Sequence, residues 1–294
     1  MKPKISVFFQ SPANVFLFRH MSPRISQFYL HAIGRLYYLV SRKEKRVIEK
    51  NVRDVLHGQD EDHVRKVVRA TFKGIFTHYF EKMFAAYRKL DIVLAYVARN
   101  FKVEGAHLLD KALEQGKGCI LVTAHWGAVE FIPWLMHALR APTSAILECA
   151  TARLEKTLRE RVSHGDIALI TSSAGESVYV QAMQALKSNR VLLTQCDEVD
   201  AWRRRRSQTI NLFGRELFFD STIDILSHRS DAPVVGAFLK RSSRNRYTLI
   251  LEDVSVQRTP ESKARDCLIL WEKYVSQFPE QWYQWKKWSA MKVA

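Results

Sequence analysis

The clearest chemical signal is a histidine followed five residues later by a glutamate, in Leu121-Val-Thr-Ala-His125-Trp-Gly127-Ala-Val-Glu130. Five residues span about 500° of helix, so one continuous helix would not place both side chains on one face. If His125 lies in the turn before a helix and Glu130 in its first turns, with Gly127 permitting the bend, the carboxylate can reach the imidazole. A carboxylate on one ring nitrogen raises the basicity of the other, which can then take a proton from a hydroxyl group.

This segment holds no serine or cysteine in a recognisable nucleophile elbow. Direct transfer to an acceptor hydroxyl is therefore more natural than a covalent intermediate. The spacing alone is a weak signal, since in ordinary compositions about one histidine in ten has an acidic residue five positions on. Its position after the apolar run 119–122 strengthens it, because ligands bind at the carboxyl ends of strands in open α/β sheets.

The elements around this segment indicate an α/β fold. Short apolar runs alternate with helical patterns at 153–162 and 178–186, which is typical of a mostly parallel sheet flanked by helices. The runs lie at 119–122, 145–147, 167–170 and 191–193. Two later strands, at 233–239 and 247–251, are expected to pair antiparallel through 241–246. A last helix is predicted from about residue 261.

The pattern before residue 101 is different. Apolar residues at three- and four-residue steps predict helix from 61 to 100. We expect an N-terminal helical, membrane-associating segment over 1–100 and an α/β domain over 101–294, forming one structural unit.

The net charge of +16 is concentrated near the N-terminus, where residues 1–53 hold eleven Lys and Arg against two Glu. Aromatic residues are interleaved with these cations, as in segments that lie at an anionic bilayer surface. An amphipathic helix docked on its own domain is the alternative. The apolar run 5–18 is interrupted by Gln10-Ser11-Pro12 and is shorter than the roughly 20 residues that a spanning helix needs.

Four stretches together resemble the lipid A biosynthesis (late) acyltransferases, within the glycerolipid acyltransferase superfamily. The segment from His125 to Glu130 resembles their H-x4-D/E block, and 191–197 resembles the strand that ends in their Asp-Gln pair. Ile210-Asn-Leu-Phe213-Gly214 with 232–235 is similar to the Val-Pro-Phe-Phe-Gly block and Ala-Pro-Val-Val strand. Residues 278–282 with Trp288 resemble the Pro-Glu-Gln-Trp ending.

The resemblance implies a fatty acyl transfer from an acyl-carrier-protein or coenzyme A thioester to a hydroxyl or amine of a membrane lipid, with a lipid A-like acceptor favoured. His125 would be the general base and Glu130 would orient it. Asp197 would support the pocket floor, and Phe213 with Gly214 would shape the acyl or acceptor site. The implied location is the cytoplasmic face of the inner membrane, peripheral or monotopic.

The sequence departs from the family pattern at three places. Ala128-Val129 stand where members usually carry Asn-Trp, Glu198 replaces the Gln of the Asp-Gln pair, and Leu212 replaces one Phe. These differences leave acyl transfer as the expected reaction and leave the acceptor open. A lysophospholipid or glycerol-phosphate acyltransferase, which would use the same base, is the nearest alternative.

Two basic features have two interpretations each. The run Arg203, Arg204, Arg205 and Arg206 is a solvated surface loop, or it is a phosphate site that docks the anionic acyl donor. The family places an arginine near Arg161, where a planar guanidinium would bind acceptor phosphate or donor. The alternative for Arg161 is a surface charge paired with Glu155 or Glu160.

Trp282, Trp285 and Trp288 recur every three residues, either as an interfacial belt or as packing against the domain. No metal or cofactor is expected, since His20, His31, His137, His164 and His228 lack ligand spacing.

Charge alone also fits a nucleic-acid-binding protein, whose binding would depend on salt and not on His125. The sequence lacks an RNA-binding aromatic-glycine signature and a recognisable helix-turn-helix, so no nucleic-acid partner is expected. A protein that binds lipid without catalysis is a further alternative.

Overall fold

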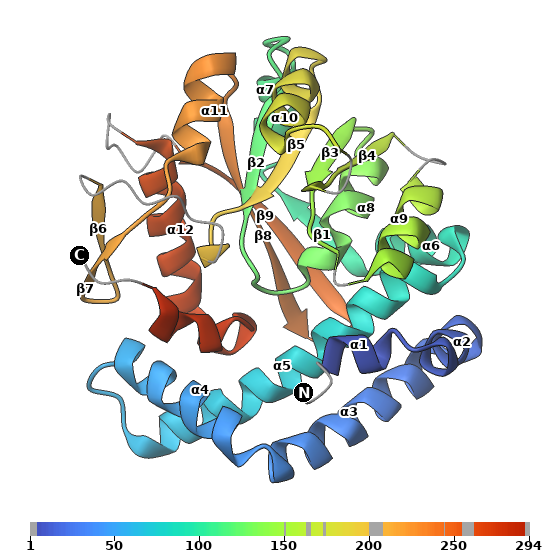
Figure 1. Ribbon diagram of the computed structural model, residues 1–294, viewed down its shortest axis with the longest axis vertical. Coiled ribbons are helices and arrows are strands. Elements are labelled where there is room, and N and C mark those ends of the chain that lie inside the picture. The colour runs from blue at the N-terminus through green and yellow to red at the C-terminus, as the bar shows by residue number, and fades with distance from the viewer. Residues whose placement is uncertain are drawn as a thin grey trace.

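A computed structural model describes residues 5–149, 151–162, 166–172, 175–199, 208–243, 245–254 and 262–291. Its centre is a seven-stranded sheet in the order β1-β9-β8-β2-β5-β3-β4 (Figure 1). The strands are β1 (Phe101–Glu104), β2 (Cys119–Thr123), β3 (Thr143–Ile146), β4 (Ile167–Ile170), β5 (Val191–Gln195), β8 (Val234–Ser243) and β9 (Arg246–Asp253). The strands from β8 to β4 run parallel, and β9 is antiparallel to β8. The predicted α/β class and antiparallel pair are confirmed.

Both faces of the sheet are buried. Successive side chains along each central strand point to opposite faces, so each strand contributes to the core on both sides. In β2, Ile120 and Val122 belong to one hydrophobic cluster, whereas Cys119 and Leu121 belong to the other. The first cluster is covered by α10 (Val178–Lys187), α11 (Thr222–Ser230) and α12 (Lys263–Gln277). The second is covered by α7 (Ala106–Leu113), α8 (Ile132–Ala138) and α9 (Ala152–Val162).

The predicted helical region before residue 101 consists of six helices, with a break at Arg88-Lys89. They are α1 (Ile5–Phe9), α2 (Pro12–His20), α3 (Pro23–Val40), α4 (Arg42–Val55), α5 (Glu61–Tyr87) and α6 (Leu90–Asn100). Helix α5 lies between α3 and α4 on one side and the sheet on the other (Figure 1). Buried residues on α5 recur every four positions, from Val64 to Phe84, and enter both hydrophobic clusters. Among the residues described, no helix is long and apolar enough to cross a bilayer.

Residues 209–218, which include the segment 210–214, form a hairpin of β6 (Thr209–Leu212) and β7 (Arg215–Phe218). These two strands were not predicted from the sequence. Both turn residues have positive φ, +48° at Phe213 and +76° at Gly214. Two successive positive φ values give the turn a twist that matches the paired strands, and glycine adopts such a conformation without strain.

The tryptophan repeat near the C-terminus is part of the protein interior. Trp282, Trp285 and Trp288 are fully buried. Two of them lie in the 3₁₀ helix η6 (Trp285–Ala290), where residues three apart fall on the same side. The alternative of an interfacial tryptophan belt is therefore wrong for these three residues.

Replacing Trp285 with alanine should lower the free energy of unfolding by about 3–5 kcal/mol, the range found for emptying a buried tryptophan site. The control is Phe28→Ala on α3, whose side chain is 75% exposed. It should change stability by no more than about 0.5 kcal/mol. Denaturant unfolding followed by tryptophan fluorescence and circular dichroism measures both, and equal effects of the two variants would contradict the buried packing.

Candidate active site

The site is built where two neighbouring parallel strands end together. Strands β2 and β5 are in register, with Thr123 opposite Gln195. The same two-residue step beyond each strand leads to His125 and Asp197. Their side chains meet, with imidazole Nδ1 3.0 Å from Asp197 Oδ1. Parallel pairing therefore places a base and a carboxylate side by side at the carboxyl edge of the sheet, where such folds bind ligands.

Asp197 is fully buried and accepts hydrogen bonds from several groups. The backbone N–H of His125 lies 3.0 Å from both carboxylate oxygens, and Trp282 Nε1 donates to Oδ2 at 2.8 Å. A buried carboxylate needs such donors to remain ionised. The result is a fixed anion that sets which ring nitrogen of His125 carries a proton and how the ring is oriented.

A second carboxylate lies on the opposite side of the ring. Glu198 Oε1 is 3.0 Å from His125 Nε2, and the other Glu198 oxygen is 3.2 Å from Lys287 Nζ. Burial alone would lower the pKa of His125, but Asp197 and Glu198 raise it to about 10. Burial would raise the pKa of Glu198, but His125 and Lys287 lower it to about 2. In this state the imidazole is a protonated cation between two anions.

Glu130 occupies a different place from the one expected. It lies in the short 3₁₀ helix η1 (Val129–Phe131), and its Oε1 is 3.5 Å from His78 Nε2 and 3.6 Å from Lys82 Nζ. The carboxylate on His125 Nδ1 is that of Asp197, so the expected contact between Glu130 and the imidazole is replaced. Burial, reinforced by Lys82, lowers the pKa of His78, which makes its ring neutral at pH 7.

The turn that carries His125 is held by the C-terminal segment. Trp126 forms a β-bridge with Trp282, Gly127 N–H donates to Gln281 O at 3.0 Å, and Tyr283 N–H donates to His125 O at 3.2 Å. Gly127 has φ +62°, and a Cβ there would lie 1.9 Å from the carbonyl oxygen of Leu239. Only glycine fits this position, which explains why a glycine stands at residue 127 between His125 and Glu130.

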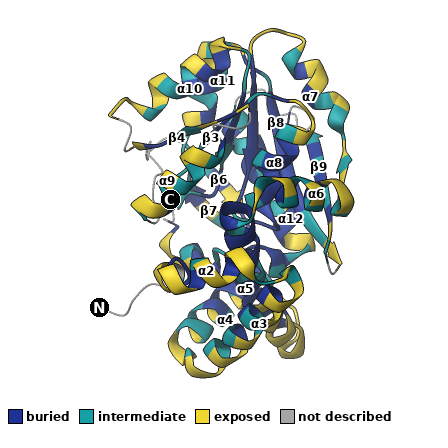
Figure 2. Ribbon diagram, turned by 90° about the vertical axis from the view of Figure 1, so that its right-hand side faces the viewer, coloured by how far each residue is buried: buried dark blue, intermediate teal, exposed yellow. Residues whose placement is uncertain are grey.

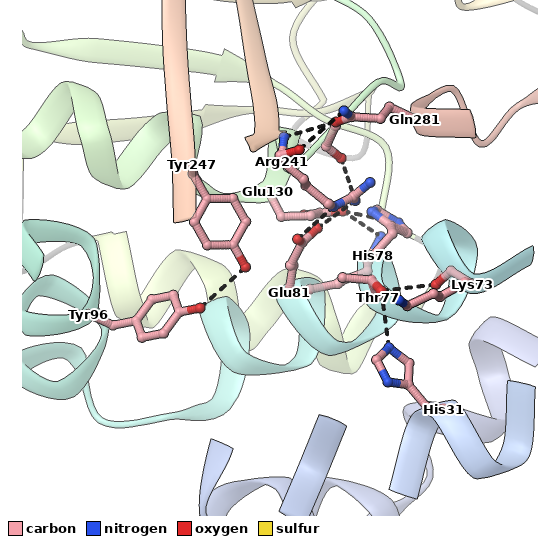
Figure 3. A network of polar contacts seen from close by, with 12 residues as sticks. His31, Lys73, Thr77, His78, Glu81, Tyr96, Glu130, Arg241, Tyr247 and Gln281 are labelled. Carbon is pink, nitrogen blue, oxygen red and sulfur yellow. Dashed lines mark hydrogen bonds and ion pairs between the residues drawn. The ribbon is translucent and has the colours of Figure 1, made fainter. Parts of the chain in front are cut away.

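A buried ion pair supports the same turn (Figure 3). Arg241 binds Glu81 through two hydrogen bonds, at 2.8 and 2.7 Å, and donates to Gly127 O at 2.5 Å. Burial would lower the pKa of Arg241, but the Glu81 carboxylate raises it. Gln281 accepts from the backbone N–H of Arg241 at 2.8 Å. Helix α5, strand β8 and the C-terminal segment thus meet at the backbone behind His125.

His125 opens on a cavity of about 230 Å³. The charged side chains in its lining include Lys82, Glu130 and Glu198. Its far wall is apolar and comes from α8, α9, β4 and β5; these side chains include Trp134, Leu154, Leu158, Val162, Leu169 and Leu193. A pocket with a polar end at a base and an apolar wall fits an amphipathic ligand.

Three predicted site residues, Arg161, Phe213 and Gly214, do not line this cavity. Arg161 donates to the carbonyl oxygens of Ala86, at 2.9 Å, and Arg88, and its guanidinium lies over the Trp134 ring. Burial and the nearby Arg19 lower the pKa of Arg161 to about 10. The ion pair expected with Glu155 is made by Arg159.

Phe213 and Gly214 lie at the tip of the β6–β7 hairpin, where the Phe213 ring packs edge-on against Trp271 and Trp288. Neither Phe213 nor Gly214 is among the residues that line the cavity. Arg203, Arg204, Arg205 and Arg206 lie outside the described residues. Within the described ranges, no group of three or more His, Cys, Asp or Glu side chains is arranged to hold a metal ion.

The sequence analysis did not assign several residues that form the site. Tyr283 packs edge-on against the imidazole, Lys82 lines the same cavity, and Lys287 pairs with Glu198. Arg241, paired with Glu81, holds the turn that carries His125. The contact between His125 and Asp197 did have a signal in the sequence, since each residue follows its strand by the same two positions. The others reach the site from α5, β8 and the C-terminus, and no local pattern in those segments marks them.

A histidine held by a buried carboxylate at the carboxyl edge of a parallel sheet, beside an apolar cavity, has the geometry of a general base for a group-transfer reaction. The model of the family described as bacterial lipid A biosynthesis acyltransferase matches residues 2–288. The chain belongs to this family. A comparison with curated proteins found no match. Family membership implies an acyltransferase with an acyl thioester donor and a lipid acceptor.

Replacing Gly127 with alanine should both strain the backbone and force the turn away from Leu239 O. The matched control is Gly116→Ala, where φ is +71° and nothing lies within 4 Å of the added Cβ. The control should lose only about 1–2 kcal/mol of unfolding free energy from its left-handed conformation. Gly127→Ala should lose clearly more, measured by thermal and denaturant unfolding. Equal losses would show that the close approach to Leu239 is not maintained.

Proposed function

We propose that this protein transfers a fatty acyl group from an acyl thioester to a hydroxyl or amine of a membrane lipid, with His125 as the general base. The observation that carries the proposal is the contact between His125 Nδ1 and the buried Asp197 carboxylate, at the polar end of an apolar cavity. A lipid A-like acceptor is favoured because the chain belongs to the lipid A acyltransferase family.

The proposed step needs a neutral imidazole. Nε2 accepts the proton of the acceptor O–H or neutral N–H as the acceptor atom attacks the thioester carbonyl. The new C–O or C–N bond forms and the C–S bond breaks. The proton then passes from Nε2 to the leaving sulfur, which departs as a thiol. Asp197 stays ionised throughout and stabilises the transient imidazolium, as a carboxylate does in other histidine-based catalysts.

In this proposal the apolar part of the cavity receives the acyl chain. Leu154, Leu158 and Val162 recur at four-residue steps along α9 and face the cavity. Glu130 and Lys82 lie at its polar end, where Glu130 is proposed to act on the reacting groups rather than on the His125 ring. The acyl donor is carried by acyl carrier protein or coenzyme A, both anionic, and the four arginines at 203–206 remain the proposed contact for it.

Membrane association is proposed through one face of α3. Ile25, Phe28, Leu36 and Leu39 lie on the same side of this helix and are 55–75% exposed. The opposite side, with Ser26, Gln27, Leu30 and Gly34, is buried. The proposed apolar surface also includes Phe8 on α1 and Phe16 on α2, which are exposed, and α2 and α3 lie at the same end of the molecule (Figure 2).

The charges around this surface favour an anionic bilayer. Arg24 and Arg35 are exposed on α3, and Arg42 and Lys43 follow at its end. Basic residues beside an inserted apolar face add attraction to anionic lipid headgroups. Helix α5 connects this surface to the cavity, since it packs against α3 and also contributes Lys82 to the cavity wall. An acceptor lipid in the cytoplasmic leaflet would then lie near His125, which supports a peripheral location at the inner membrane.

Replacing His125 with alanine should reduce acyl transfer by at least about 100-fold, because removing a general base typically loses a factor of 10²–10⁴. The control is His228→Ala on the exposed side of α11, which should keep normal activity. The assay follows a labelled acyl group from acyl carrier protein or coenzyme A into lipid extracted from cells that lack the gene. Near-normal transfer by a folded His125→Ala protein would refute the mechanism.

The same assay separates the two carboxylates. Asp197→Asn should remove most of the activity and change its dependence on pH, because Asp197 contacts the ring. Glu130→Gln should lower the rate without moving the pH dependence. The labelled product also identifies the acceptor, and label in phosphatidate or phospholipid would instead establish a lysophospholipid or glycerol-phosphate acyltransferase.

Replacing Phe28 and Leu39 together with serine should weaken binding to vesicles of phosphatidylethanolamine and phosphatidylglycerol by about tenfold for each side chain. Transfer of such a side chain from water contributes at least about 1.5 kcal/mol. The control pair, Tyr179→Ser with Val180→Ser on α10, removes two apolar residues of about 40% exposure from another surface. Vesicle sedimentation measures both proteins. Unchanged binding after the α3 substitutions, or an equal loss in the control, would refute this surface.

A further inference from the structure

Both ring nitrogens of His125 face carboxylate oxygens. Nδ1 is 3.0 Å from Asp197, and Nε2 is 3.0 Å from Glu198. An ionised carboxylate accepts hydrogen bonds and donates none, so each ring nitrogen must carry its proton. A ring in this state has no free lone pair, and it cannot accept a proton from an acyl acceptor. The atom that the proposed reaction needs, Nε2, is therefore closed by Glu198.

The two carboxylates differ in how firmly they are held. Asp197 is fully buried and is fixed by the backbone of His125 and by Trp282. The Glu198 side chain is 40% exposed, and its other ion-pair partner is Lys287, which is also partly exposed. Glu198 follows the end of β5 and forms part of the cavity wall. Its carboxylate can turn away from the ring toward Lys287 and solvent without breaking the core.

The other ionisable groups around the ring do not replace Glu198. Helix α5 contributes His78, which burial keeps neutral, and Lys82, which contacts Glu130. The C-terminal segment contributes Tyr283, whose ring stands edge-on to the imidazole, and Lys287. Arg241 lies behind the turn and is neutralised by Glu81. The anionic groups on the ring itself are Asp197 and Glu198.

We propose that Glu198 is a positioning residue that closes Nε2 of His125 in the resting enzyme and turns away toward Lys287 when the acyl acceptor binds. The inference rests on the proposed role of His125 as the base. When the contact with Glu198 opens, the imidazolium loses its Nε2 proton to solvent, and the neutral ring can then take the proton of the acceptor. Before the acceptor binds, the enzyme thus keeps a protonated, unreactive histidine beside the bound thioester, which limits transfer of the acyl group to water.

Replacing Glu198 with glutamine tests this directly. An amide can donate to an unprotonated Nε2 and carries no charge, so the ring should lose its proton more readily. The acidic limb of the kcat/KM profile should move to lower pH by about one unit or more, the scale of one lost charge-assisted hydrogen bond. Thioester hydrolysis without acceptor should increase at neutral pH. The matched control is Glu216→Gln, an exposed carboxylate on β7, which should leave the profile in place.

A second measurement does not depend on activity. Nuclear magnetic resonance of the ¹⁵N-labelled His125 ring should show a lower titration midpoint in Glu198→Gln than in the parent protein, with no change in Glu216→Gln. An unchanged midpoint and an unchanged acidic limb would overturn the inference. If Glu198→Gln is unstable, Glu198→Ala serves in the same titration. Full activity of His125→Ala would refute the proposed function itself, whereas an inactive His125→Ala with an unmoved Glu198→Gln profile refutes only the role of Glu198.

Discussion

The rest of the site depends on the hydrogen bonds that the buried Asp197 carboxylate accepts. A fully buried anion is unfavourable unless nearby donors compensate it. Here the compensation comes from the backbone and ring of His125 and from the Trp282 indole. These donors come from two other parts of the chain, so Asp197 connects the end of β5 with the turn after β2 and with the C-terminal segment. The position of the base follows from the need to satisfy one buried charge.

The C-terminal segment is part of the proposed site because of this requirement. Trp282 can reach Asp197 only if the backbone of 281–283 pairs with the turn at 125–127, and the Gln281 side chain continues that pairing to Arg241. Arg241 in turn binds Glu81, which is fully buried. Removing either charge would leave the other buried without a partner, which is strongly destabilising. The buried tryptophans therefore belong to the same assembly as the base, although they do not face the cavity.

The sequence allowed much of the fold to be predicted, because strands buried on both faces produce apolar runs that can be recognised locally. It also identified His125 and Asp197, but it paired His125 with Glu130. That error has a physical origin. Spacing within one segment is visible in a sequence, whereas the contact with Asp197 depends on β2 and β5 being neighbours with equal lengths. The tryptophan repeat was ambiguous for a related reason, since a period of three describes a buried 3₁₀ helix as well as an exposed belt.

The distribution of charge in this basic protein indicates that phosphate binding and the reaction take place at different sites. Although the chain carries a net charge of +16, the cavity is lined by three carboxylates, those of Glu130, Glu148 and Glu198, and by one lysine, Lys82. Like charges repel most strongly where water is partly excluded, so a phosphate is disfavoured beside these carboxylates. The phosphates of donor and acceptor are then expected to bind to basic residues outside the cavity, and only the uncharged reacting groups to reach His125. This arrangement suits the proposed cycle, in which His125 first releases its Nε2 proton and then receives a proton from a neutral acceptor.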